Sequence, residues 1–228
     1  MITQALILRI VKQISQLVMR NLLLSSFIVI LLAGCKLGHY AKLKEMPEPD
    51  TSAFKSIYGE NFNSFLYKTN IRAYGKDFSG LLVTKQMQPK DYRVIFTTEL
   101  GMKLFDFEFK DTSFTLHYCV PQFNRPVLLT TIQKDIEILL MNNLDGKPIA
   151  HYSDEKNTYD IRQIQFKDHF NYYYRGKASH HIEKIEHSRN GTIKTIFTLK
   201  DYNADLPGNI VIKHYNIKLR IELNLLKK

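Results

Sequence analysis

The chain has 228 residues and a formal net charge of +10, from 32 lysines and arginines against 22 aspartates and glutamates. A chain of this length supplies one domain with a substantial core. The basic residues are scattered among the expected strands rather than clustered, which argues against a nucleic-acid-binding protein. This moderate positive charge fits a solvated surface, or one that meets an anionic membrane or an acidic partner.

A short apolar segment near the N-terminus ends in a cysteine. Arg20 precedes an apolar run from Leu22 to Ala33, which closes with Leu31-Leu32-Ala33-Gly34-Cys35. Positive charge, a short apolar core and small residues before a cysteine are typical of a bacterial lipoprotein signal peptide. The run is shorter than the roughly 20 residues that a helix needs to cross a bilayer. We therefore expect residues 1–34 to be removed and Cys35 to carry a covalent lipid, with no other cofactor.

Two explanations fit the residues before this segment. Met19 stands where a short signal peptide would begin, so residues 1–18 would be an upstream extension. Alternatively they form an amphipathic stretch, because apolar residues repeat there at helical spacing: Leu6, Ile7, Ile10, Ile14 and Leu17. In either case we expect them to lie outside the fold.

Residues 35–53 are expected to form the lipidated N-terminus and an extended tether, because Met46-Pro47-Glu48-Pro49-Asp50 is rich in proline. With Cys35 acylated, Cys119 has no cysteine left for an intrachain disulfide. Cys119 lies in a strand-like run without a nucleophile–base pattern, so we expect it to pack as a small apolar side chain.

Residues 54–228 are expected to form a single, mainly β domain. The tail from Ile210 is the longest strand-like run, with a bend expected near Tyr215, and Asn190-Gly191 predicts a type I′ hairpin. That asparagine also begins an Asn-Gly-Thr glycosylation sequon, but the turn alone explains the pair. Alternating apolar and polar residues predict the other strands at 64–74, 78–87, 91–98, 102–109, 113–120, 157–166, 169–174, 180–187 and 192–200.

One internal helix is expected from about Val127 to Asn143. Pro126 precedes it, Asp145-Gly146 would end it, and its apolar residues repeat at i, i+3 and i+4. About ten antiparallel strands would expose their edges unless the sheet curled, with the helix covering the open side. The expected fold class is therefore mainly β with covering helices, an incomplete antiparallel β-barrel or half-barrel.

The two faces of one predicted strand differ in polarity. Phe105, Phe107 and Phe109 fall on one face, and Asp106 and Glu108 fall on the other. We expect the phenylalanines to be buried and both carboxylates to face solvent, which is more economical than a catalytic carboxylate pair. A concave apolar face of this kind holds either a cavity for acyl chains or a filled core.

Enzyme chemistry is not expected. His180 and His181 are adjacent, so in a strand they would point to opposite faces, and the stretch from His181 to His187 lacks the spacing of a helical zinc motif. The sequence has no Gly-x-Ser-x-Gly elbow and no phosphate-binding glycine loop. We therefore expect neither a catalytic cluster nor a metal site.

Three stretches carry a family resemblance. They are Tyr92-Arg93-Val94-Ile95-Phe96-Thr97-Thr98-Glu99-Leu100-Gly101, then Ile185-Glu186-His187-Ser188-Arg189-Asn190-Gly191, and finally Leu206-Pro207-Gly208-Asn209-Ile210 with Lys218-Leu219-Arg220-Ile221. In this order, after the cysteine motif, residues 54–228 resemble the outer-membrane lipoprotein receptor family LolB and its relative, the periplasmic carrier LolA. The resemblance implies an incomplete barrel with helices as a lid. It also implies a protein that takes acylated lipoproteins from the carrier and passes them into the outer membrane.

The resemblance also implies site residues and partners. Leu100 matches the apolar loop residue that touches the membrane in that family, although Glu99 stands where proline is expected and the chain has no tryptophan. Lys36 rather than aspartate after the cysteine implies sorting to the outer membrane, with the domain facing the periplasm. The expected partners are a LolA-like carrier, acylated lipoproteins and the membrane, with no nucleic acid, and we expect a monomer. Candidate acyl-cavity residues, which ordinary core packing would explain equally well, are Phe96, Phe105, Phe107, Phe109, Phe114, Leu116 and Phe197.

A lipid-binding protein or a structural envelope lipoprotein of the same fold, without transfer activity, remains the alternative.

Overall fold

The computed structural model describes residues 16, 18–19, 21, 40, 42–47, 56–58, 62–141, 149–166 and 168–227. The chain divides into two units, Met1–Ala41 and Lys42–Lys228, and the second unit contains its own hydrophobic core. Cys35 and the apolar run before it lie outside the described residues. Within the described residues, no helix combines the length and apolar character needed to cross a membrane.

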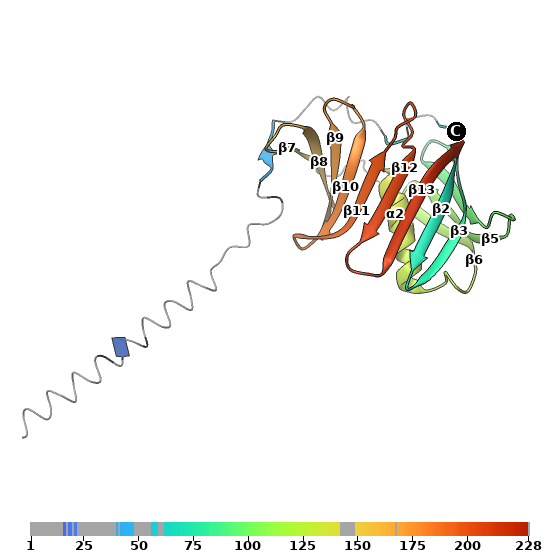
Figure 1. Cartoon of the computed structure of the whole chain (residues 1–228), viewed down its shortest axis with the longest axis horizontal. Coiled ribbons are helices and arrows are strands. Elements are labelled where there is room, and N and C mark those ends of the chain that lie inside the picture. Colours follow the sequence, from blue (N-terminus) through green and yellow to red (C-terminus); the bar gives the residue numbers. More distant parts are fainter. Residues whose placement is uncertain are drawn as a thin grey trace, which may run out of the picture. The chain divides into compact units, whose positions relative to one another are not determined.

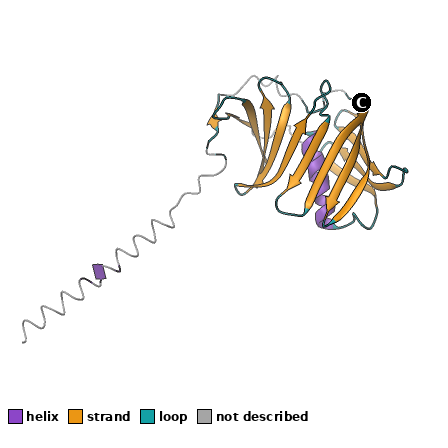
Figure 2. Cartoon of the chain, viewed as in Figure 1, coloured by secondary structure: helices purple, strands orange, loops and turns teal. Residues whose placement is uncertain are grey.

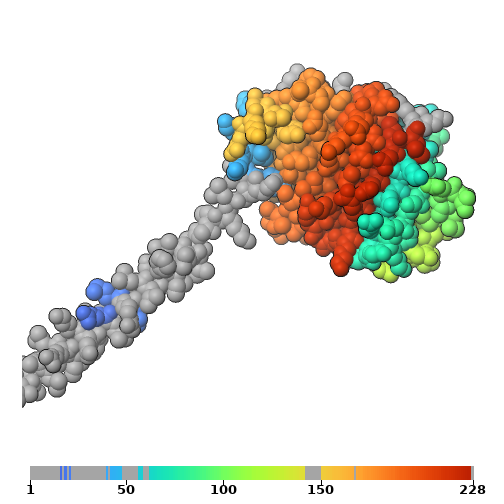
Figure 3. Space-filling view, in the orientation of Figure 1, coloured from blue at the N-terminus to red at the C-terminus, as the bar shows by residue number. Residues whose placement is uncertain are grey.

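The second unit is built on one antiparallel sheet, in which thirteen strands are described. The strands are β1 (Lys44–Glu45), β2 (Ser64–Ala73), β3 (Lys76–Gln88), β4 (Asp91–Thr97), β5 (Lys103–Lys110), β6 (Ser113–Cys119), β7 (Ile149–Ser153), β8 (Tyr159–Phe166), β9 (His169–Gly176), β10 (Ile182–Arg189), β11 (Thr192–Lys200), β12 (Asn209–His214) and β13 (Leu219–Lys227). Their order in the sheet is β1-β7-β8-β9-β10-β11-β12-β13-β2-β3-β4-β5-β6. The last strand, β13, therefore pairs with β2, and Figure 3 shows these C-terminal and N-terminal strands side by side on the surface.

The sheet curls but does not close, since β1 and β6 stand at opposite ends of the strand order. A single helix in the described part of this unit, α2 (Pro126–Leu140), lies across one face of the sheet (Figures 1 and 2). The predicted class, a mainly β open half-barrel, is confirmed. The expectation of several covering helices is replaced by one helix among the described residues.

The helix begins as the sequence predicted but ends earlier. Pro126 occupies the first turn, where the missing N–H costs nothing. Met141 adopts a left-handed conformation, with φ of 53°, and its N–H donates to the carbonyls of Glu137 and Ile138. This cap ends the helix after Leu140 rather than at Asn143, and residues 142–148 lie outside the described residues.

The predicted tail strand is two strands. Tyr215–Lys218 reverse the chain, so β12 and β13 pair with each other, for example at Ile212↔Ile221. The expected bend near Tyr215 is therefore a full hairpin, because the strand-like composition continues through the turn. At Asn190 and Gly191, by contrast, both φ angles are positive, 52° and 70°, and the predicted type I′ turn is confirmed.

Strands β1 and β7 were not predicted. Glu45 pairs with Tyr152, so the stretch expected to be a tether, residues 35–53, contributes a strand to the sheet. Both strands are short, with two and five residues, and neither has enough length for alternation to be recognised. These two segments are strands because β7 pairs with β8 and β1 pairs with β7.

The core lies between α2 and the face of the sheet that the helix covers, which we call the inner face. Consecutive strand pairings place one apolar row on this face, and every member of it is buried: Tyr173, Ile185, Phe197, Ile212, Ile221 and Ile71. From the helix, Leu128, Ile132 and Leu139 are also buried. Burying each large apolar side chain contributes about 1.5–3 kcal/mol, so this contact holds the helix on the sheet.

Candidate lipid-binding site

All seven predicted acyl-cavity residues lie on the inner face. Residues directly opposite each other in a sheet point to the same side, and the register pairs Phe96 with Phe105 and Phe109 with Phe114. Leu116 is opposite Phe107 on the edge strand β6, and Phe197 belongs to the apolar row described above. The alternating pattern therefore assigned these side chains to a common face, whereas their role in acyl binding stays a prediction.

Most of these aromatic rings are packed against one another. Phe105 and Phe107 stack with ring centroids 4.3 Å apart, and Phe96 lies 5.3 Å from Phe105. Phe123, from the segment between β6 and α2, contacts both Phe96 and Phe105 edge-on. These side chains are completely or almost completely buried. In this conformation they form a filled core, and an acyl chain would enter only if α2 or the rings moved.

The inner face becomes accessible at edge strand β6. Phe114 is half-buried there, and Leu116 is 37% exposed. Phe114 still contacts Phe107, with ring centroids 5.2 Å apart. The edge of the sheet thus offers apolar surface that is continuous with the buried phenylalanines.

A polar row crosses the inner face beside the apolar row. Strand pairings align Asn171 with His187, His187 with Thr195, and Thr195 with His214. His187 Nδ1 lies 2.8 Å from the side-chain oxygen of Asn171, and Thr195 Oγ1 lies 3.0 Å from His214 Nδ1. From the helix, Asp135 Oδ2 accepts a 2.9 Å bond from His214 Nε2. This buried chain ties α2 to β11 and β12.

The order hydroxyl, imidazole and carboxylate in this chain is that of a hydrolase triad, which the sequence pattern did not suggest. Thr195 is only 4% exposed, and His214 and Asp135 are also buried. In this conformation the hydroxyl is covered by the protein, so the arrangement supports a structural tie between helix and sheet.

Burial also changes the protonation of the polar row. Burial lowers the pKa of His187 to about 4, and the nearby His169 and Lys134 lower it further. Burial raises the pKa of Asp135, although its hydrogen bond from His214 opposes the shift. His187 is therefore neutral at neutral pH, and it donates to Asn171 as an uncharged group.

Leu100 lies at the tip of the hairpin that joins β4 and β5. The backbone N–H of Gly101 donates to the Thr98 carbonyl, and the Thr98 N–H donates to Met102, at 2.9 and 2.8 Å. Gly101 has φ of 85°, a conformation that glycine adopts without strain. The hairpin thus closes without the expected proline, and it leaves the Leu100 side chain 99% exposed.

Glu99, which replaces the expected proline, forms a surface ion pair with Lys68 at 2.9 Å. Both side chains are more than half exposed, so this pair contributes little to stability. Met102, two residues beyond Leu100, is exposed as well. The tip therefore presents two apolar side chains to solvent.

The expectation that Asp106 faces solvent is wrong, because this residue is only 1% exposed. Arg93 Nε and Lys103 Nζ each donate to its carboxylate at 2.5 Å, and Arg93 also reaches Glu108 at 3.0 Å. Burial opposes ionisation of Asp106, but the hydrogen bonds from Arg93 and Lys103 outweigh it and lower its pKa. Glu108 is half-buried, and His117 Nε2 lies 2.5 Å from it. These groups form an ion-pair network on the outer face.

The remaining sequence candidates lie apart from the inner face. Cys119 is half-buried against the core, and burial raises the pKa of its thiol, which suits a packed side chain. His181 stacks on Tyr202, with ring centroids 4.2 Å apart, whereas His180 contacts Arg175. The two adjacent histidines thus have different neighbours.

Comparisons with known proteins identify the fold. Neither a family model nor a curated protein matches the sequence. A structure described as a candidate outer membrane lipoprotein-sorting protein domain, from Vibrio parahaemolyticus, has 12% identity and a TM-score of 0.51, over 73% of this chain and 84% of that one. A LolA superfamily protein from Nitrosomonas europaea has 11% identity and a TM-score of 0.50, over 72% and 84%. This chain therefore has the open half-barrel fold seen in these structures.

Proposed function

We propose that this chain is a LolB-like, lipid-anchored envelope protein that accepts acylated lipoproteins from a periplasmic carrier and helps to insert them into the outer membrane. The observation that carries the proposal is Leu100, a leucine left fully exposed at a hairpin tip. Water disfavours such a side chain, and contact with lipid would bury it. The fold agrees, since one structural neighbour is described as a candidate lipoprotein-sorting domain.

The transfer mechanism needs no covalent catalysis. Each buried CH₂ group of an acyl chain contributes about 0.8 kcal/mol, so a chain can pass from one apolar surface to another and then into the bilayer. The inner face and the exposed edge of β6 would supply the intermediate surface. Because the phenylalanines are tightly packed, α2 would have to shift, and its polar ties to His214 and Tyr173 would break.

The covalent lipid on Cys35 would hold the domain at the membrane, and Lys36 after the cysteine favours the outer membrane. Leu100 would then approach the bilayer from the folded domain. This arrangement gives the protein two contacts with lipid, an anchor and an apolar tip, which together bind a membrane more firmly than either alone.

A second candidate is a lipid-binding or structural envelope lipoprotein of the same fold, without transfer activity. The burial of Phe96, Phe105 and Phe107 favours the structural form of this candidate, because a permanently filled core has no room for an acyl chain. The two candidates differ in what they take up. A transfer protein captures an acylated protein, a lipid-binding protein captures free lipid, and a scaffold captures neither.

Capture is therefore the test. Residues 36–228, which contain the whole second unit, are mixed with an acylated lipoprotein held by a LolA-like carrier, and co-purification of the cargo is measured. The same cargo without acyl chains, and a free fatty acid, are the controls. We expect capture of the acylated protein alone. Uptake of free lipid only, or of nothing, would move the conclusion to the second candidate.

A further inference from the structure

Two neighbouring hairpins concentrate positive charge at one end of the sheet. One turn joins β2 to β3 and the other joins β12 to β13, and β12, β13 and β2 stand side by side (Figure 1). The backbone N–H of Tyr74 donates to the Lys218 carbonyl at 2.9 Å, so the two turns touch. We call the cations of these turns, together with Tyr74 and Tyr215, the basic tip. The cations are Arg72, Lys76, Lys213, Lys218 and Arg220.

The sheet register places like charges opposite one another on the basic tip. Arg220 is paired with Arg72 on one side and with Lys213 on the other, on the outer face of the sheet. Like charges in directly opposite positions destabilise a sheet. Asp77 forms an ion pair with Arg72 at 2.8 Å. Glu222 forms one with Arg220 at 2.6 Å. The five cations of the tip thus exceed these two carboxylates, and an anionic partner would offset the excess.

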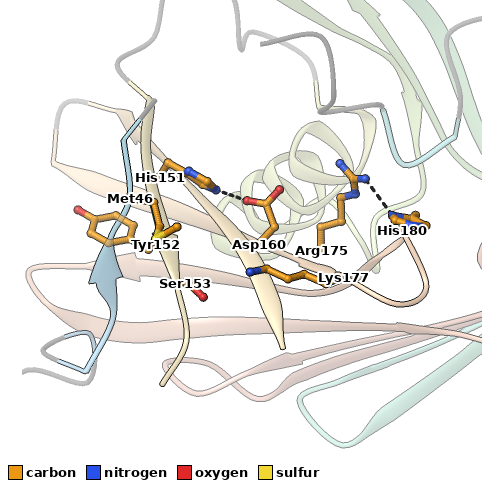
Figure 4. Close-up of a pocket in the computed structure, with 8 residues that line it drawn as sticks. All are labelled: Met46, His151, Tyr152, Ser153, Asp160, Arg175, Lys177 and His180. Atoms are coloured by element: carbon orange, nitrogen blue, oxygen red, sulfur yellow. Dashed lines mark hydrogen bonds and ion pairs between the residues drawn. The ribbon is translucent and has the colours of Figure 1, made fainter. Parts of the chain in front are cut away.

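A pocket near the β1 end of the strand order shows the opposite arrangement. There Asp160 of β8 is paired with Arg175 of β9, so opposite charges stand in opposite positions (Figure 4). Asp160 is also hydrogen-bonded to His151, and Arg175 Nη2 lies 3.2 Å from His180 Nδ1. Both charged groups therefore have partners within the protein. The basic tip differs because its cations outnumber the carboxylates beside them.

Two exposed tyrosines stand among the cations of the basic tip. Tyr74 is 44% exposed and Tyr215 is 55% exposed. Tyr74 has φ of 50°, a left-handed conformation that is unfavourable for a bulky side chain. Lys213 Nζ lies 4.9 Å from the centre of the Tyr215 ring. Tyrosine is enriched at membrane–water interfaces, because its ring contacts carbon atoms while its hydroxyl contacts water. The tip thus combines two kinds of side chain that suit the head-group region of a membrane.

We propose that the basic tip docks on the head groups of an anionic phospholipid bilayer. The negative surface of such a bilayer attracts lysine and arginine, over a range of about 10 Å at roughly 0.1 M salt. The turns after β2, β4 and β12 lie at the same end of this antiparallel sheet, so docking holds the Leu100 hairpin towards the bilayer. The basic tip shares no residue with that hairpin, and the proposal holds whether or not the chain transfers lipoproteins.

Co-sedimentation of residues 36–228 with vesicles tests this surface without the lipid anchor. The vesicles are phosphatidylcholine with or without phosphatidylglycerol, and we expect binding only when phosphatidylglycerol is present. Each cation near an anionic surface strengthens binding about fivefold, so the double variant Lys213→Gln/Lys218→Gln should bind about 25-fold more weakly. The matched control, Lys85→Gln/Lys110→Gln, removes the same charge from exposed positions at the other end of the sheet. It should bind within about twofold of the parent.

The aromatic part of the tip has its own variant. Tyr215→Ser should also weaken binding to the vesicles that contain phosphatidylglycerol, because it removes the ring that contacts the head-group region. Tyr118→Ser, at an exposed position on β6, is the control and should bind like the parent.

Three results would overturn the proposal. The first is equal vesicle binding by the two double variants, with both folded as judged by circular dichroism. The second is binding of polyglutamate but not of vesicles, which would identify an acidic protein as the partner. The third is a loss of vesicle binding in Leu100→Glu alone, which would assign the membrane contact to that hairpin and leave the basic tip without a role in it.

Discussion

Among single residues, Asp106 is the buried charge whose environment is best defined. Its carboxylate accepts hydrogen bonds from Arg93 and Lys103 while remaining inaccessible to solvent. Asp106→Asn removes the negative charge and leaves both cations with a weaker acceptor, so we expect a loss of about 1–3 kcal/mol in the free energy of unfolding. Urea denaturation of the parent and the variant measures this difference in the free energy of unfolding. Asp77→Asn, which breaks an exposed pair with Arg72, is the control and should cost under about 0.5 kcal/mol; equal losses would contradict this account.

His187 should make stability depend on pH. Its pKa is about 4 in the folded chain and ordinarily about 6.5, so between pH 7 and pH 5 the unfolded chain binds a proton at this position that the folded chain does not. Stability should therefore fall over this range. Burial is the main cause of the low pKa, and His169, Lys134, His214 and Arg189 lower it further because they disfavour a charged imidazole.

The size of this effect is obtained from a variant. His187→Gln retains an amide that can donate to Asn171 but cannot titrate. Between pH 7 and pH 5 we expect the parent to lose on the order of 1–2 kcal/mol more than the variant in denaturant unfolding. Parallel pH profiles for the two proteins would show that His187 is not the group responsible.

Residue-level prediction from the sequence succeeded where a side chain's role follows from local alternation. Phe105, Phe107 and Phe109 of β5 were assigned to one face in this way, and Phe96 of β4 was assigned to the same apolar set. It failed for Asp106, because alternation predicts the face of the strand but not the cations that neighbouring residues bring to it. The hydrogen bond between Asp135 and His214 joins positions 79 residues apart, and a local sequence pattern cannot predict such a contact.

At the scale of elements, α2 is tied to the sheet by the buried hydrogen bond between Asp135 and His214. Asp135→Ala removes the acceptor of a buried histidine, so we expect a loss of about 2–4 kcal/mol and faster hydrogen exchange along Pro126–Leu140 than in β2 or β13. The exposed Thr130→Ala, on the same helix, should leave exchange nearly unchanged. Uniformly faster exchange across the sheet would mean that the tie is not specific to the helix.

Elements with long alternating runs were predictable, and those defined by pairing were not. Strands β2 to β6 and β8 to β11 lie within a few residues of their expected positions. The separation of β12 from β13 was missed because Ile217 maintains apolar character through the turn. β7 was missed because its five residues become a strand only through their bonds to β8.

For the whole molecule, attachment to the membrane depends on Cys35, which lies outside the described residues. We expect the full chain, expressed in a Gram-negative host, to incorporate labelled palmitate and to fractionate with membranes, because the cysteine follows a complete signal-peptide pattern. Cys35→Ser should abolish labelling. The matched variant Cys119→Ser, in the folded domain, should be labelled like the parent. Label retained in Cys35→Ser would refute the predicted anchor.

The overall class, a curled antiparallel sheet with a helix across it, followed from counting strands and asking how their edges could be covered. The sequence did not predict whether the interior holds a cavity or a filled core, because the same apolar alternation is found in both. The packed rings of Phe96, Phe105 and Phe107 settle this for the conformation described here. An acyl chain could therefore enter only after these rings or α2 had moved.

The most direct test of the proposed receptor role separates capture of cargo from its delivery. An acylated lipoprotein is loaded onto residues 36–228, liposomes are added, and the cargo that sediments with them is measured for the parent and for Leu100→Glu. The control is Met87→Glu, which places the same charge at another exposed apolar position. We predict that Leu100→Glu captures cargo normally but delivers little of it, while the control delivers like the parent. Equal delivery by all three proteins would contradict the account.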